Sequence, residues 1–77
     1  MLFMTQFDII PGKADEMIYK MRNPKVPENV VIKYKMQLFG KPDFIIIYEA
    51  PDEQTALNFI LQFTDCATPR TSLANPL

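Results

Sequence analysis

The order in which the hydrophobic periodicity changes along the chain is the feature that most limits its fold. Alternation with period two is typical of strands, and an apolar spacing near 3.6 residues is typical of helices. The strand-like segments cover residues 2–10, 30–39, 44–50 and 67–73. The helical stripes fall at i, i+3, i+4 and i+7, and consist of Ala14, Met17, Ile18 and Met21, then Ala56, Phe59, Ile60 and Phe63. The chain therefore reads strand, helix, strand, strand, helix, strand.

This β-α-β-β-α-β order predicts an α+β, ferredoxin-like fold, with a four-stranded antiparallel sheet and two helices on one face. A length of 77 residues allows one domain, residues 1–77. Right-handed crossovers place the first and third strands in the centre and the other two at the edges. Pro69 also confines the last strand to an edge or a bulge. Asp52 is the expected N-cap of the second helix.

The two faces of the sheet differ in what is expected to cover them. If Phe39 lies opposite Phe44 across the turn, Ile45 and Ile47 fall on the more continuously apolar face, which is expected to meet the helices. The opposite face then carries an uncovered apolar patch, and such a patch marks an interaction surface. We expect a sheet-to-sheet homodimer whose interface includes Phe39, Phe44, Ile46 and Tyr48.

Composition argues against several classes of function. A net charge of -1 argues against generic nucleic-acid binding. The absence of histidine excludes histidine-based catalysis and histidine metal ligands, and a single cysteine excludes a disulfide framework, so neither a metal nor a cofactor is expected. The apolar start of the chain lacks a basic segment and is interrupted by Gln6 and Asp8, so it predicts neither a signal peptide nor a membrane span. We expect a cytoplasmic protein with no membrane partner.

A candidate ligand site combines Gln6, Asp8, Lys35 and Tyr48. The first two lie on a central strand, and Lys35 would pair across to Tyr48 in the expected register. Polar groups within an apolar surface are typical of small-molecule sites, and the lysine would favour an anionic head group. The alternatives are structural: hydrated groups at a strand end, lysines that protect an edge strand, and an interface tyrosine. Cys66, at a helix end, is expected to pack in the core.

Residues 39–53 read Phe-Gly-Lys-Pro-Asp-Phe-Ile-Ile-Ile-Tyr-Glu-Ala-Pro-Asp-Glu and resemble the GYD domain. That family typically reads Gly-x-Tyr-Asp, then a hydrophobic strand and Glu-Ala-Pro-Asp; here Pro42 stands in place of the tyrosine. Pro11-Gly12-Lys13 is similar to the same group. The whole chain looks like small bacterial and archaeal proteins of unknown function in the dimeric α/β barrel superfamily, which includes antibiotic-biosynthesis monooxygenases and Lrp-type ligand domains.

The resemblance implies a ferredoxin-like protomer, a sheet-to-sheet homodimer and no catalytic residue. Monooxygenase relatives often use histidine, tryptophan or asparagine near the cleft, and this chain lacks the first two. We therefore expect a non-catalytic module that binds a small anionic or apolar ligand or serves regulation. The alternatives are a cofactor-independent monooxygenase or isomerase acting in the barrel cleft, and a structural partner subunit. An enzyme needs a pocket with convergent polar groups, whereas a structural subunit buries those groups in its contacts.

Overall fold

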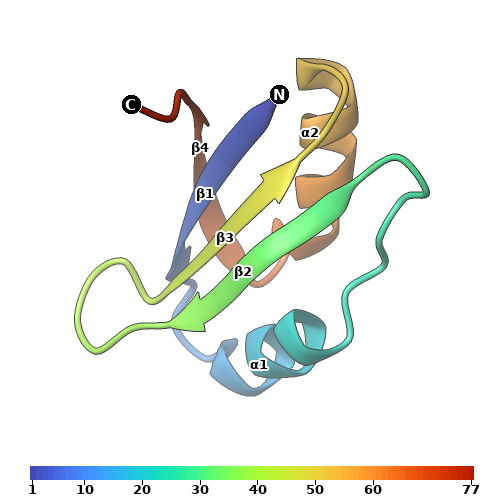
Figure 1. Ribbon diagram of the computed structural model, residues 1–77. Coiled ribbons are helices and arrows are strands. Elements are labelled where there is room, and N and C mark those ends of the chain that lie inside the picture. Colours follow the sequence, from blue (N-terminus) through green and yellow to red (C-terminus); the bar gives the residue numbers. More distant parts are fainter.

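The sheet and both helices follow the order expected from the sequence (Figure 1). A computed structural model describes all residues from Met1 to Leu77. Its elements are β1 (Leu2–Ile9), α1 (Ala14–Arg22), β2 (Val31–Gln37), β3 (Phe44–Glu49), α2 (Glu53–Ile60), a short 3-10 helix η1 (Leu61–Phe63) and β4 (Ala67–Ala74). The strands form one antiparallel sheet in the order β2-β3-β1-β4. The predicted ferredoxin-like arrangement, with β1 and β3 in the centre, is confirmed.

One face of the sheet packs beneath the helices and forms the core. Its central residues are cross-strand partners on β1 and β3, so each pair lies on the same face. The pairs are Phe3 with Tyr48, Thr5 with Ile46, and Phe7 with Phe44, and all six residues are buried. The helices contribute four further residues to the same core cluster: Met17, Met21, Phe59 and Ile60. Aromatic contacts connect the layers, because the ring centroids of Tyr48 and Phe59 lie 5.1 Å apart.

The expected assignment of the two faces was wrong. Ile46 is completely buried beneath the helices, whereas Ile45 and Ile47 are half-buried on the other face. The alternation of β1 explains this outcome, since Phe3 and Phe7 need burial and share a face with Ile46. Gln6 and Asp8 occupy the opposite parity and would be costly to place under a helix.

The register of the β2–β3 hairpin also differs from the expected one. Phe44 lies opposite Gln37, not Phe39, and Phe39 projects from the turn fully exposed. Further along, the pairing shifts between Ile32 and Tyr34, which leaves Lys33 as the extra residue of a β-bulge. The bulge reverses the parity of β2, because Ile32 lies opposite the buried Tyr48 while Tyr34 lies opposite Ile47 on the open face.

The turn between β2 and β3 is tied to the end of β1 through Asp43. The Ile9 amide donates to Asp43 Oδ2 over 2.8 Å, and the Asp43 amide donates to the Phe7 carbonyl over 2.9 Å. The Ile9 amide and then Lys41 lower the pKa of the Asp43 carboxyl. The conspicuous aspartate of the Gly-Lys-Pro-Asp segment therefore anchors a loop in this fold.

The start of α2 follows the expected capping pattern. The Thr55 amide donates to Asp52 Oδ1 over 2.7 Å, which satisfies one of the free amides of the first turn. Hydrogen bonding from the Thr55 side chain, and then from its amide, lowers the pKa of Asp52. Neither helix has both the length and the apolar character needed to cross a membrane.

Candidate functional site

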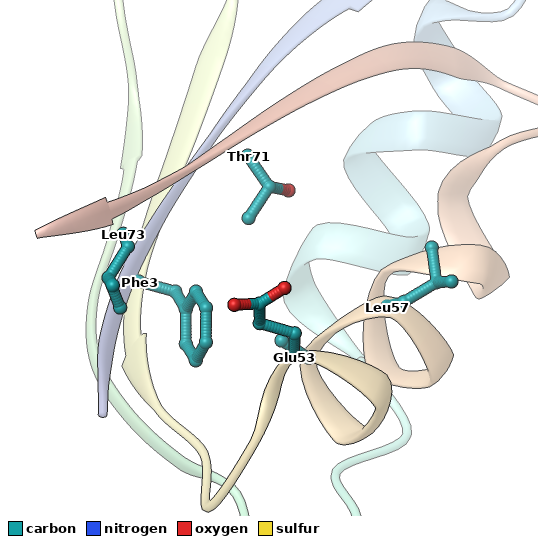
Figure 2. A pocket seen from close by; sticks show the side chains of 6 residues that line it. Phe3, Glu53, Leu57, Thr71 and Leu73 are labelled. Carbon is teal, nitrogen blue, oxygen red and sulfur yellow. The ribbon is translucent and has the colours of Figure 1, made fainter.

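A cleft lies between α2 and the edge strand β4. Its volume is about 420 Å³. The side chains that line it come from β1, α2 and β4, and are Phe3, Glu53, Ala56, Leu57, Thr71 and Leu73. Figure 2 shows the Glu53 carboxylate reaching into the space between the Phe3 ring and Thr71. The cleft is thus apolar along most of its wall, with one carboxylate and one hydroxyl.

The fold positions each of these groups for a simple reason. Thr71 and Leu73 alternate with Arg70 and Ser72 along β4, so they point toward the helices. Glu53 lies in the first turn of α2, where a carboxylate is favoured by the positive end of the helix dipole. It makes no ion pair or hydrogen bond within the chain, and its side chain is exposed. Glu53 is the one titratable group that lines the cleft.

A row of hydroxyl groups leads from the core to the cleft. Tyr48 Oη and Thr5 Oγ1 lie 3.0 Å apart, and Thr5 Oγ1 lies 2.8 Å from Thr71 Oγ1. Tyr48 is completely buried, and its hydroxyl interacts with both Thr5 and Thr71. Burial raises the pKa of Tyr48, and the hydrogen bonds with Thr5 and then Thr71 offset part of that effect.

The direction of the protons in this row follows from the partners available. A buried hydroxyl hydrogen without an acceptor costs about 1–3 kcal/mol, which favours donation from Tyr48 outward to Thr5 or Thr71. If Thr5 donates to Thr71 in turn, every buried hydrogen of the row has an acceptor. Thr71 keeps its own hydrogen, and it is exposed where it lines the cleft. Thr71 is thus the member of the row whose hydroxyl a ligand in the cleft can reach, and in this arrangement it is a donor.

The four residues of the predicted ligand site do not come together. Gln6 and Asp8 lie on the open face, where Arg70 donates to both of them over 3.0 and 2.7 Å. Tyr48 is on the other side of the sheet, in the core. Lys35 also turns toward the helices and donates to the Met21 carbonyl over 2.9 Å. Its opposite residue is Ile46, not Tyr48, because the register differs from the expected one.

Three of the four predicted interface residues are in the core as well. Phe44, Ile46 and Tyr48 are buried under the helices, so none of them can form a surface on the open face. The reason is the reversed assignment of faces described above. Phe39 is the exception, and its place in an interface stays a prediction.

The open face carries a different apolar surface. Its members are cross-strand neighbours on three strands, and consist of Leu2, Met4, Ile45, Ile47, Val31, Tyr34 and Met36. None of these side chains is fully buried, and Val31, Tyr34 and Met36 are exposed. The polar group of Gln6, Asp8 and Arg70 borders this surface. Asp8 Oδ1 is buried there without a hydrogen-bond partner.

A smaller hollow lies where α1 ends beside β2. Its volume is about 200 Å³, and Arg22 and Lys35 are its charged residues. Lys35 already satisfies a carbonyl at the end of α1, a position that favours a cation. This side chain therefore serves the helix terminus, in agreement with a structural reading of the lysines on this strand.

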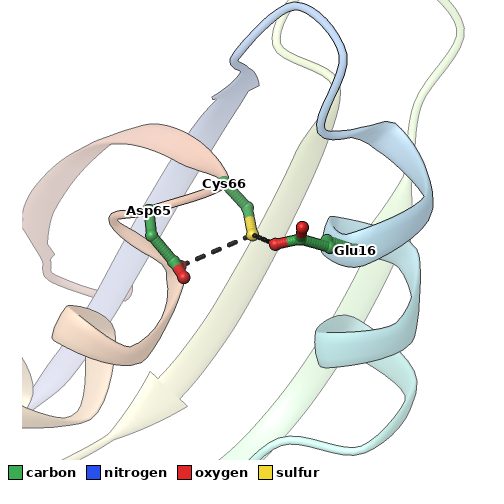
Figure 3. A group of neighbouring side chains, drawn as sticks. All are labelled: Glu16, Asp65 and Cys66. Carbon is green, nitrogen blue, oxygen red and sulfur yellow. Dashed lines mark hydrogen bonds between the residues drawn. The ribbon is translucent and has the colours of Figure 1, made fainter.

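Cys66 forms a cluster with Glu16 and Asp65 (Figure 3). Its thiol donates to Glu16 Oε2 over 3.2 Å and to Asp65 Oδ1 over 3.4 Å. Burial and these two acceptors raise the pKa of the thiol to about 11. Lys20 lies 2.6 Å from Asp65 Oδ1 and balances the carboxylates. The buried thiol, predicted to be a core group, thus ties α1 to the segment before β4.

Comparison of the chain with family models, with curated proteins and with solved structures gives no match. The cleft therefore has to be interpreted from its own chemistry. Sequence reasoning missed Glu53 and Thr71, because the first reads as an ordinary helix-start carboxylate and the second as one polar residue of an edge strand. Glu53 and Thr71 line the same cleft only because α2 and β4 pack side by side in the folded chain.

Proposed function

We propose that this protein is a small homodimeric module that binds a mostly apolar small molecule in the cleft between α2 and β4. The cleft carries the proposal, because a volume of about 420 Å³ lies in the usual range for ligand sites. Its composition also fits: an apolar wall with Phe3, Leu57 and Leu73, and few polar groups that can fix an orientation.

The chemistry of the cleft changes the class of ligand expected from the sequence. Lys35 is not available to bind an anionic head group, since its ammonium group is hydrogen-bonded to a carbonyl at the end of α1. The charge in the cleft is the carboxylate of Glu53, which disfavours an anionic head group. No reaction is assigned, because that exposed carboxylate is the only titratable group in the lining, and Tyr48 is behind the wall.

Tryptophan scanning tests the cleft directly, because the chain has no tryptophan of its own. Leu57 lines the cleft and Leu61 does not, although their exposed fractions are 53% and 52%. Titrating 1-phenylethanol into Leu57→Trp should change the fluorescence in a saturable way, while Leu61→Trp should not respond. Equal responses, or no response from either variant, would contradict the proposal.

The homodimer is proposed to form through the open face of the sheet. Support comes from the apolar surface of β1, β2 and β3 described above, which no element of the chain covers. The buried Asp8 Oδ1 adds a second argument, because a carboxylate oxygen without a donor is costly and a second copy can supply one. A chain of 77 residues also gains stability from association. This arrangement agrees with the GYD-like resemblance, which we keep as part of the proposal.

Sedimentation velocity tests the dimer. The wild-type chain should sediment as a particle of twice 8.9 kDa at micromolar concentration. Ile47→Asp places a charge at the centre of the open face and should give a folded monomer. Leu61→Asp, on the 3-10 helix, is the matched control and should remain dimeric. A wild-type monomer, or an equal effect of both substitutions, would refute the proposed interface.

A further inference from the structure

We infer that the cleft between α2 and β4 selects an amino alcohol: an apolar body with an ammonium group for Glu53 and an adjacent oxygen that accepts from Thr71. This inference rests on the proposed ligand-binding function and names the class of ligand. Two polar groups on opposite walls carry it, one an acceptor with a negative charge and the other a donor.

Glu53 accounts for the ammonium group. Its carboxylate points into the cleft and has no cation of the chain within ion-pair distance. Asp52 adds a second negative charge at the same end of α2, and it already occupies the free amide of Thr55. The α-ammonium of Met1 lies beside the start of α2, where it donates to the Ala50 carbonyl, and Lys33 pairs with Glu49. A ligand cation would therefore pair with the Glu53 carboxylate, which has no ion-pair partner within the chain.

Thr71 accounts for the oxygen. When the buried hydroxyls of Tyr48 and Thr5 donate outward, which gives each of their hydrogens an acceptor, Thr71 accepts from within the protein and has its own hydrogen to give. A ligand oxygen that accepts this hydrogen completes the row. The remaining lining, Phe3, Leu57 and Leu73, suits an aromatic or aliphatic body.

A set of related probes separates these contributions. The reference is 2-amino-1-phenylethanol; 1-phenylethanol lacks its amine, 2-phenylethylamine lacks its hydroxyl, and mandelate replaces the aminomethyl group by a carboxylate. The methyl ether of the reference keeps an oxygen that can accept but cannot donate. Affinities come from titrations followed by the amide resonances of Leu57 and Leu73. The reference should bind about fivefold tighter than either truncated probe, and mandelate should bind weakest.

Four variants assign each advantage to a residue. Glu53→Gln should abolish the gain in affinity that the amine gives and should leave the gain that the hydroxyl gives. Thr71→Val should do the opposite. Glu28→Gln and Thr68→Val make the same chemical changes outside the cleft lining and should alter neither. Added salt should reduce only the amine advantage, because an exposed ion pair is screened. The methyl ether should keep the hydroxyl advantage if Thr71 is the donor.

The outcomes distinguish two failures. If no probe shifts the cleft resonances, the proposed ligand-binding function is wrong. If 1-phenylethanol or mandelate binds there as tightly as the reference, the cleft binds ligands but the amino-alcohol assignment is wrong. If the methyl ether loses the advantage while the alcohol keeps it, the inferred direction of the hydroxyl row is wrong and Thr71 acts as an acceptor.

Discussion

The two faces of the sheet contain similar numbers of apolar strand residues and yet have opposite roles. The face under the helices carries Phe3, Phe7, Ile46 and Tyr48, all buried within the chain. The open face carries Ile45, Ile47 and their neighbours, which are only half-buried or exposed. The difference teaches that hydrophobicity on one hairpin does not decide which face a helix covers. The central strand β1 decides it, because its polar residues cannot lie under a helix.

Charge on adjacent residues of β3 should give the largest contrast between the faces. Ile46→Asp buries an unpaired carboxylate, which costs several kcal/mol against a total stability of about 4–12 kcal/mol for a chain of this size. We expect this variant to be unfolded by circular dichroism. Ile47→Asp should keep its fold as a monomer and lose less stability than Ile46→Asp, since its side chain lies on the open face. An unfolded Ile47→Asp with a folded Ile46→Asp would reverse the assignment.

The two phenylalanines beside the β2–β3 turn give the next contrast. Phe44→Ala removes a buried ring and should lower the unfolding free energy measured in urea by about 3–5 kcal/mol. Phe39→Ala should change the unfolding free energy by less than about 0.5 kcal/mol, because Phe39 is exposed in the turn. Similar losses at both positions would mean that the two rings lie opposite each other, as the sequence alone had suggested.

The hydroxyl row predicts a smaller difference between two tyrosines. Tyr48→Phe removes the hydrogen bond to Thr5 and should cost about 1 kcal/mol. Tyr19→Phe, exposed on α1, should leave the unfolding free energy within about 0.5 kcal/mol of the wild type. Equal values would show that the Tyr48 hydroxyl has no net role in stability.

Cys66 predicts a modest dependence of stability on alkaline pH. The pKa of its thiol rises on folding from the reference value of 9.0 to about 11. The folded state therefore holds the proton more tightly, and this contribution is complete below a pH of 9.0 and is lost as pH rises toward about 11. The unfolding free energy measured in urea should decrease less steeply with pH across that range in Cys66→Ser than in the wild type. An unchanged slope would place the thiol in an ordinary environment.

Much of the fold could be predicted because its signals are local. The period of each segment, the Asp52 cap and the edge position of Pro69 all depend on neighbours in sequence. The faces could not be assigned from β2 and β3, because the bulge at Lys33 sends Ile32 inward and Tyr34 outward although both have the same parity. A pattern of period two carries no sign of an inserted residue.

The candidate site depended on contacts between distant segments. Glu53 and Thr71 belong to different elements, and nothing in their local sequences indicates that they line one cleft. The four residues of the predicted ligand site are separated for a related reason. Lys35 and Tyr48 lie on the helix-covered face of the sheet, whereas Gln6 and Asp8 lie on the open face. Side-chain parity on the central strand was the available signal, and applying it to β3 would have separated these residues.

A nuclear Overhauser spectrum of the wild-type protein tests the assignment of the faces most directly. The Tyr48 ring lies with its centroid 5.1 Å from that of Phe59 and 5.7 Å from that of Phe3. Cross-peaks from the Tyr48 ring protons to both phenylalanine rings are the predicted result. Cross-peaks from the Ile47 methyl groups to the Phe59 ring, with none from Tyr48, would contradict it.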